Sequence, residues 1–218
     1  YIGTVGYYKM HADFVEMSSS VAIPDVKFLV CGGGIENQLR MEAQRRGTES
    51  RFEFLGYQKE IASVIGQMDV YGYPLCHDTY ASGELNLQEV MYAGVPPVVF
   101  PYGGVKSLVV NQYTGLVVTS KEEYREAIEF LYHRPDERQR MGENAAAYAR
   151  QMFGAEHAGK RLNEFYERML ESDKWLRPGL FSGESVGGPA LISDASGGAR
   201  LFVDSMGVDD NPFLISLD

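Results

Sequence analysis

The clearest fold signal lies in Glu89-Val90-Met91-Tyr92-Ala93-Gly94-Val95-Pro96-Pro97-Val98-Val99-Phe100. Its first half completes a short helix, predicted from Asn86 to Ala93, which Gly94 and Pro96 bring to an end. Its second half, Pro97–Phe100, is almost continuously apolar, as is typical of a parallel strand buried on both faces. The stretch therefore predicts a helix, a tight turn and a buried parallel strand.

The same alternation of short apolar runs and amphipathic stretches continues on both sides. Strands are expected at residues 1–6, 26–31, 51–56, 69–75, 97–100 and 115–118, and helices at 10–21, 36–46, 59–68 and 86–93. Three more helices are expected without intervening strands, at 120–133, 136–153 and 155–170, the first of them capped by Ser120. The pattern predicts an α/β fold: a doubly wound, Rossmann-like parallel sheet of about six strands with extra C-terminal helices.

The composition changes near Pro178, after which Gly, Ser and Asp dominate. We therefore expect one domain over residues 1–175. Residues 176–218 are interpreted as a linker or tail, or as the beginning of another domain. The chain opens directly on a strand-like segment without Met, so we expect a fragment of a longer protein.

Charge and composition narrow the class of protein. The net charge of −10 argues against a general nucleic-acid binder, which presents basic surface to phosphates. No apolar run approaches the roughly 20 residues of a membrane span, and no signal peptide is recognisable. Cys31 and Cys76 show no metal-ligand spacing, so two reduced thiols in a cytoplasmic protein are expected.

The fold itself predicts where a ligand binds. In an open parallel sheet, ligands lie outside the carboxyl ends of the strands. Five glycine-containing loops fall there, at residues 6–9, 31–34, 56–59, 76–86 and 102–106. Because glycine lets backbone N–H groups come close and helix N-termini favour anions, this edge suits a phosphate-bearing small molecule.

Three side chains at this edge carry charge that a ligand could use. Lys9 follows the first strand and lies near a helix start, where a bound anion would offset its unfavourable position. Glu84 and Glu89 flank the start of the helix at 86–93, and a carboxylate can accept from two neighbouring ribose hydroxyls. Each also has a simpler interpretation as a solvated surface residue. His77 and Asp78 adjoin in the same loop without forming a triad or a metal site.

The order of motifs resembles a known family. These are Gly32-Gly33-Gly34, Phe54-Leu55-Gly56, Asp69-Val70-Tyr71, Glu89 to Val99, Gly103-Gly104, Thr114 to Val117, Arg138 to Gly142 and Gln151 to Phe153. Over residues 1–170 they are similar to the C-terminal, donor-binding domain of retaining GT-B glycosyltransferases, the group 1 or family 4 class.

The resemblance implies a donor site for a UDP-, GDP- or ADP-type nucleotide sugar, with no metal and no other cofactor. It implies that Glu89 holds the ribose hydroxyls, that Lys9 contacts the diphosphate, and that Gly56 and Tyr57 border the nucleobase. Backbone amides of residues 83–86 would meet the phosphates. The implied catalytic residues are Lys9 and Glu84; the implied donor-binding residues are Gly6, Gly33, Gly56, Tyr57, His77, Ser82, Gly83, Leu85, Asn86 and Glu89.

The chain also departs from the family pattern. Ala81 stands where the family often has an acid that contacts the sugar, and Tyr7 or Tyr8 stands where it has an Arg. The resemblance further implies an N-terminal acceptor-binding domain, absent here, so this chain is expected to bind nucleotide weakly and to be inactive alone. Two alternatives stay open: a nucleotide-sugar 2-epimerase of GT-B architecture, and a non-catalytic nucleotide-sugar-binding or scaffold module. A flavodoxin-like or receiver-like domain fits the sheet but not the three C-terminal helices.

Overall fold

The computed structural model describes residues 1–171. The predicted tail, 176–218, lies outside the described residues, and the domain boundary predicted at residue 175 stays a prediction. Internal contacts divide the chain into two units, Tyr1–Leu162 and Asn163–Asp218, and each is described by itself.

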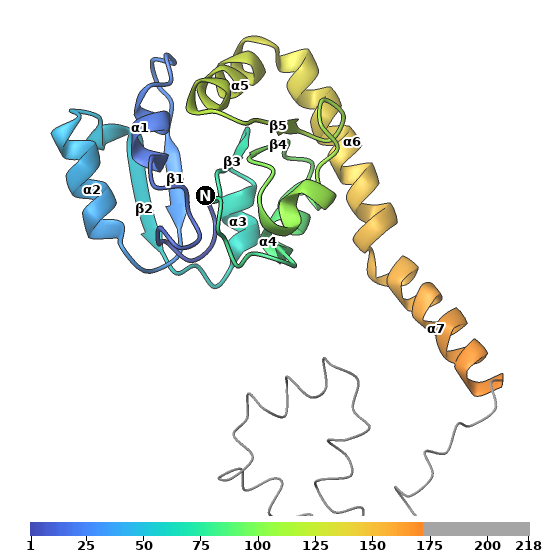
Figure 1. The fold of residues 1–218 in the computed structure, drawn as a ribbon. Coiled ribbons are helices and arrows are strands. Elements are labelled where there is room, and N and C mark those ends of the chain that lie inside the picture. Colours follow the sequence, from blue (N-terminus) through green and yellow to red (C-terminus); the bar gives the residue numbers. More distant parts are fainter. Residues whose placement is uncertain (172–218) are drawn as a thin grey trace, which may run out of the picture. The chain divides into compact units, whose positions relative to one another are not determined.

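Five short parallel strands form the centre of the first unit (Figure 1). β1 (Phe28–Cys31) pairs with β2 (Phe52–Gly56), and β4 (Pro97–Val99) lies between β3 (Tyr71–Tyr73) and β5 (Leu116–Val117). All of these pairs are parallel, and β4 is completely buried, as its apolar sequence predicts.

The N-terminal residues fill the place between these two groups of strands. Ile2 bridges in parallel to Cys31 of β1, and the Tyr71 hydroxyl of β3 donates to the Ile2 carbonyl. The order is therefore β2, β1, residues 1–5, β3, β4, β5, with the chain running outward in both directions from its start (Figure 1). This order is that of a doubly wound sheet, so the predicted α/β fold is confirmed.

Two predicted elements at the N-terminal end differ from the observed ones. Residues 1–6 form only isolated bridges at Ile2 and Val5, because Gly3 between them has a φ of 139° and leaves the extended conformation. The helix expected at residues 10–21 spans only Phe14–Ser19 (α1). Its first turn is lost because Met10 bridges to Leu75 and the His11 amide donates to the Pro74 carbonyl.

Most of the remaining helices lie close to their predicted positions, but the helix expected at residues 59–68 spans only Ile61–Ile65. The remaining helices are α2 (Glu36–Arg45), α3 (Ile61–Ile65), α4 (Leu85–Tyr92), α5 (Lys121–His133), α6 (Pro135–Phe153) and α7 (Ala155–Glu171), with 3-10 turns at Glu49–Arg51 (η1) and Gly103–Ser107 (η2). α1 packs against both α2 and α5, whereas α4 packs against α6. These two groups of helices are the layers expected on either side of a doubly wound sheet.

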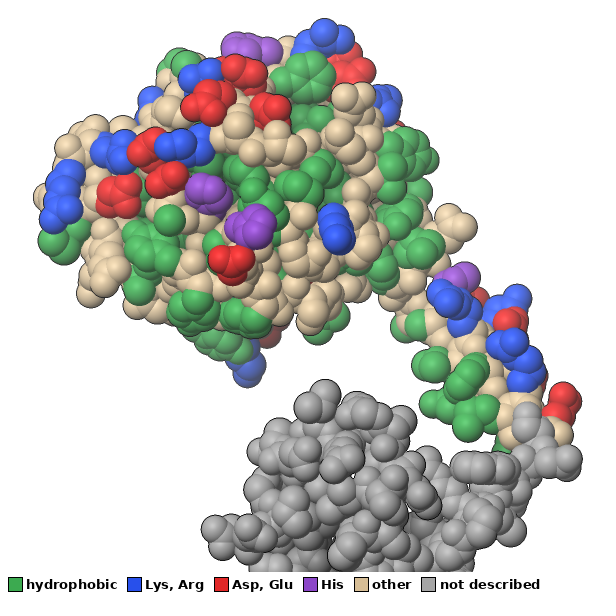
Figure 2. Space-filling view, viewed as in Figure 1, with side chains coloured by type: hydrophobic (Ala, Val, Ile, Leu, Met, Phe, Trp, Pro, Cys, Tyr) green, Lys and Arg blue, Asp and Glu red, His purple; other side chains and the backbone are tan. Residues whose placement is uncertain are grey.

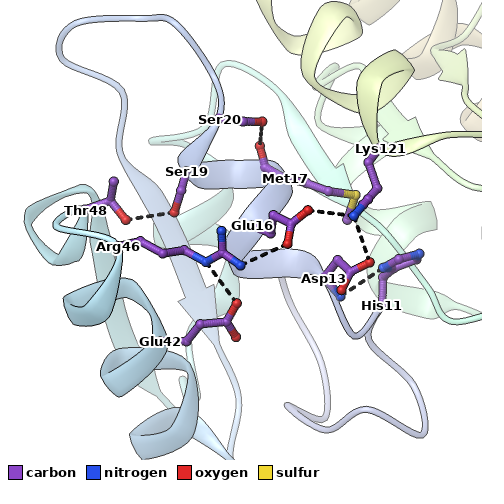
Figure 3. Close-up of polar contacts among 10 residues, drawn as sticks. All are labelled: His11, Asp13, Glu16, Met17, Ser19, Ser20, Glu42, Arg46, Thr48 and Lys121. Carbon is purple, nitrogen blue, oxygen red and sulfur yellow. Dashed lines mark hydrogen bonds and ion pairs between the residues drawn. The ribbon is translucent and has the colours of Figure 1, made fainter.

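A network of ion pairs joins the helices of the first group (Figure 3). The Glu16 carboxylate on α1 accepts from Arg46 at the end of α2 (2.9 Å) and from Lys121 at the start of α5 (2.6 Å). Lys121 and Arg46 also pair with Asp13 and Glu42, at 3.4 and 3.2 Å. Charges of both signs therefore mingle where α2, α1 and α5 reach the surface (Figure 2), and the network orients three helices about one carboxylate.

α5 begins with the cap that its sequence predicts. The Ser120 side chain accepts from the Glu123 amide at 3.1 Å, while the Glu123 carboxylate accepts from the Thr119 amide. We expect Ser120→Ala to lower the free energy of unfolding by about 1 kcal/mol, because the Glu123 amide loses its acceptor. Urea unfolding of both proteins measures this; Ser63→Ala, which removes an exposed hydroxyl from α3, is the comparison, and an equal loss in both variants would contradict the cap.

α7 is strongly amphipathic. Its exposed apolar side chains, Leu162, Phe165, Tyr166, Met169 and Leu170, gather along one side of the helix and its charges along the other (Figure 2). Within residues 1–171, none of the helices combines the length and the apolar character that crossing a membrane requires.

Candidate functional site

The loops at the carboxyl ends of the strands are joined to one another. In the first loop, the Gly6 carbonyl accepts from the Lys9 amide (2.9 Å), and the Lys9 carbonyl accepts from the Cys76 amide of the loop after β3 (2.8 Å). That loop continues to η2, where the Gly104 amide donates to the Ala81 carbonyl at 3.0 Å. A Cβ at Gly104 would overlap the Ser82 carbonyl, so the close approach requires glycine.

Lys9 and Glu84 meet at the centre of these loops. The Lys9 Nζ lies 3.4 Å from the Glu84 Oε2, and their side chains are only 12% and 4% exposed. The Tyr73 hydroxyl at the end of β3 donates to the same oxygen. Burial and this bond raise the pKa of Tyr73, so its hydroxyl stays protonated and remains a donor. The sequence analysis placed Lys9 and Glu84 at one site, and the structure brings them into contact.

Glu84 adopts an uncommon backbone conformation. It precedes α4 with a φ of 33° and a ψ of 59°, in the left-handed region that few residues other than glycine enter. This conformation costs on the order of 1 kcal/mol and persists only where surrounding contacts favour it. The Lys9 ion pair and the Tyr73 bond are such contacts, so the turn aims the carboxylate inward rather than to solvent.

Two tyrosine rings border the ion pair. Tyr8 and Tyr80 stack with 6.0 Å between their centroids, although they are 60% and 62% exposed. The Lys9 Nζ lies 6.0 Å from the centroid of Tyr80 and 5.8 Å from that of Tyr73. Cation–π interactions with both rings thus stabilise the Lys9 ammonium group in this position.

Asn86 ties α4 to the N-terminal segment. Its Nδ2 donates to the Ile2 carbonyl (2.6 Å) and to the Tyr71 hydroxyl (2.7 Å). The Asn86 side chain therefore fixes the start of α4 against the sheet. A role of Asn86 in donor binding stays a prediction.

The other predicted site residues are exposed at the same edge. Gly33, Tyr57, Ser82, Gly83, Leu85 and Glu89 are accessible, Tyr57 to 84%. His77 bonds to Asp78 at 2.8 Å and meets the Tyr102 ring edge-on. Gly56 turns the chain out of β2 with a φ of 63°. The roles of these residues in donor binding stay predictions.

Cysteine and metal chemistry do not mark this edge. Cys31 and Cys76 both carry free thiols, and burial raises the pKa of each. In the described part of the chain, no three His, Cys, Asp or Glu side chains come together in a way that could hold a metal ion.

The sequence also identifies the family of this chain. The sequence model for glycosyl transferases group 1 matches residues 1–148. The chain belongs to this family. The family assignment agrees with the resemblance drawn from the motifs between Gly32 and Val117.

Two curated relatives illustrate the range of the family. An uncharacterized glycosyltransferase of Methanocaldococcus jannaschii is 28% identical over 118 residues, which are 52% of this chain and 29% of the relative. A GDP-mannose-dependent alpha-mannosyltransferase of Mycobacterium tuberculosis is 26% identical over 139 residues, 64% of this chain and 35% of the relative. The chain thus spans about a third of the length of these relatives.

Solved structures share the fold. Anabaena HepE, in complex with UDP and glucose, superposes with a TM-score of 0.69 at 19% identity, over 77% of this chain and 47% of that one. A glycosyltransferase of Rickettsia africae gives a TM-score of 0.71 at 17% identity, over 79% and 47%. The described fold therefore corresponds to about half of each of these chains.

Tyr73 and Tyr80, which border the Lys9–Glu84 pair, were not among the predicted site residues, and Tyr8 was noted only as standing where the family has an Arg. A usable signal existed for Tyr73, because Tyr71 and Tyr73 alternate along β3, and two residues at that spacing point to the same face. Their rings stack at 5.1 Å. No local pattern indicates Tyr8 and Tyr80, because their loops meet only in the folded chain.

Proposed function

We propose that this chain is the donor domain of a glycosyltransferase and binds a nucleotide-diphosphate sugar at the carboxyl edge of its sheet. The observation that carries the proposal is the contact between Lys9 and Glu84 beside the start of α4, in a member of this family. A cation next to a helix N-terminus suits a diphosphate, and a carboxylate suits the hydroxyls that flank it.

Each part of the donor has a matching group. Lys9 and the amides of residues 83–86 receive the diphosphate, and Glu84 faces the sugar beside it. The exposed carboxylate of Glu89, further along α4, holds the ribose hydroxyls, and Tyr57 borders the base. As the glycosyl bond breaks, charge develops on the leaving diphosphate, which Lys9 and the α4 N-terminus stabilise. We also propose that transfer retains the configuration of the sugar and needs no metal, as the resemblance to the family implies.

The relatives support both the proposed class of donor and the proposal that a further domain completes the enzyme. One is named as dependent on GDP-mannose, and HepE was solved with UDP and glucose. Since the chain spans 35% of the mannosyltransferase, we infer that another domain of the same protein, N-terminal to this one, binds the acceptor and completes the enzyme. A cytoplasmic location, expected from the two thiols, remains part of the proposal.

Calorimetric titration of the chain with UDP, GDP and ADP tests donor binding. We expect saturable heat with at least one of them at millimolar ligand or below, and no sugar transfer by the chain alone. If none of the three binds at millimolar concentration, the donor site is refuted and the scaffold alternative is favoured. Measurable transfer by the isolated chain would refute the need for a second domain.

A further inference from the structure

We propose that Glu84 makes this site prefer a diphosphate that carries a sugar over the free nucleoside diphosphate. The inference rests on the proposed function, because it concerns the same site. Besides contact with the sugar, Glu84 would then distinguish the substrate, a nucleotide sugar, from the product, the free nucleoside diphosphate.

The first step is the charge balance of the site. The Glu84 carboxylate lies 3.4 Å from the Lys9 ammonium, and both side chains are almost completely buried. Together they are neutral. A diphosphate that binds at Lys9 therefore also lies close to the negative charge of Glu84. Glu84 therefore weakens the attraction of Lys9 for a ligand, and the effect grows with the negative charge of the ligand.

The second step is the unused oxygen of Glu84. Tyr73 and Lys9 both contact Oε2, and no group among residues 1–171 donates a hydrogen bond to Oε1. Within residues 1–171, every fully buried polar side-chain atom except Ser18 Oγ has a hydrogen-bond partner. Because Glu84 Oε1 has no such partner, it is not fully buried and keeps some contact with solvent. Oε1 therefore offers its lone pairs to a donor outside the protein.

The third step compares the two ligands. A free nucleoside diphosphate ends in a phosphate monoester-like group whose second ionisation has a pKa of about 6, so it carries nearly one extra negative charge at pH 7.5. In a nucleotide sugar that oxygen is esterified, the extra charge is absent, and the sugar adds hydroxyl donors. Glu84 therefore repels the free diphosphate more strongly than the less charged nucleotide sugar, and it accepts a hydrogen bond from the sugar.

The selection has a consequence for turnover. When the glycosyl group leaves, the bound diphosphate gains the charge that Glu84 opposes. Repulsion between unit charges a few ångströms apart in a partly solvated site changes affinity by about tenfold. Glu84 would therefore promote release of the product while the intact donor stays bound.

The test measures two dissociation constants for each protein: the free diphosphate and its sugar, as UDP with UDP-glucose or GDP with GDP-mannose. Glu84→Gln keeps the side-chain shape and removes the charge. We expect the free diphosphate to bind about tenfold more tightly and the nucleotide sugar to bind equally or more weakly. A variant that shifts both constants by the same factor, or favours the sugar further, overturns the inference.

Glu89→Gln is the matched control on the same helix. Both ligands contain the ribose, so it should weaken both equally and leave the ratio of the two constants unchanged. A change in that ratio as large as the one from Glu84→Gln would also overturn the inference, because the selection would then not belong to Glu84.

A second pair of variants guards against misfolding. Asp and Asn both tolerate the left-handed backbone at position 84 and differ only in charge. We expect Glu84→Asn to favour the free diphosphate relative to Glu84→Asp by several-fold; equal ratios would count against the inference. If the unaltered chain binds neither ligand, the proposed function itself fails. If it binds both but the variants show no selection, only the role of Glu84 fails.

Discussion

Alanine at Gly32 or at Gly34 is expected to destabilise the domain by more than about 4 kcal/mol, or to prevent folding. Alanine at Gly33, between them, should change the free energy of unfolding by less than about 1 kcal/mol. The three glycines are adjacent in the sequence and chemically identical. Their surroundings in the folded chain differ.

The difference arises from how closely the N-terminal segment passes this turn. A Cβ at Gly32 would overlap the carbonyl of Gly3, and one at Gly34 would overlap the carbonyl of Val5. Both glycines also have φ values, 134° and 149°, that side chains with a Cβ rarely adopt. At Gly33 the nearest atom would be the Glu36 Oε1, 3.9 Å away.

Chemical unfolding of the three single variants measures this difference. Gly33→Ala is the matched control, because it adds the same methyl group to the same turn. Equal destabilisation by all three substitutions would contradict the packing of residues 1–5 beside β1. That result would also place the loop of Lys9 elsewhere, because Lys9 follows directly from this segment.

The second large effect concerns ligand affinity. We expect Glu89→Ala to weaken nucleoside diphosphate binding by at least about 10- to 100-fold, because even one charge-assisted hydrogen bond between this carboxylate and a ribose hydroxyl is worth roughly 1.5–3 kcal/mol. Glu89 is exposed on α4, so its loss should leave the free energy of unfolding nearly unchanged.

Calorimetric titration with the nucleotide that the unaltered chain binds most tightly measures this effect. Glu122→Ala is the matched control: it removes another exposed helix carboxylate, on α5. It should leave the dissociation constant within about twofold, since distant surface charges are screened. An affinity unaltered by Glu89→Ala would remove Glu89 from the ribose site, whereas equal losses in both variants would indicate a general effect of net charge.

Much of the fold was predictable because its signals are local. The apolar run Pro97–Phe100 marks a buried strand, Ser120 and Glu123 mark a helix start, and Pro135 marks the next one. Each depends on residues within one or two turns of chain. The N-terminal elements were predicted less well, since residues 1–6 and Met10 are shaped by partners at Cys31, Gly34 and Leu75.

The candidate site likewise has features that the sequence predicts and features that only the folded chain shows. Its expected position at the carboxyl edge follows from the alternation of strands and helices, and Glu89 and Lys9 were predicted to belong to it from the order of motifs around them. Tyr73 and the stacked rings of Tyr8 and Tyr80 were not, because they come from separate loops.

The stretch from Glu89 to Phe100 thus predicted the fold class and the edge at which a ligand is expected, because periodicity and helix stops depend on neighbouring residues. The state of Glu84 depended on the folded chain. In the sequence it is one of 30 acidic residues and could be solvated. In the fold it occupies a left-handed turn, buried against Lys9 and Tyr73, which lie 75 and 11 positions away along the chain. Burial and charge pairing arise from contacts between distant segments, so only the tertiary arrangement turns an ordinary glutamate into a candidate for substrate selection.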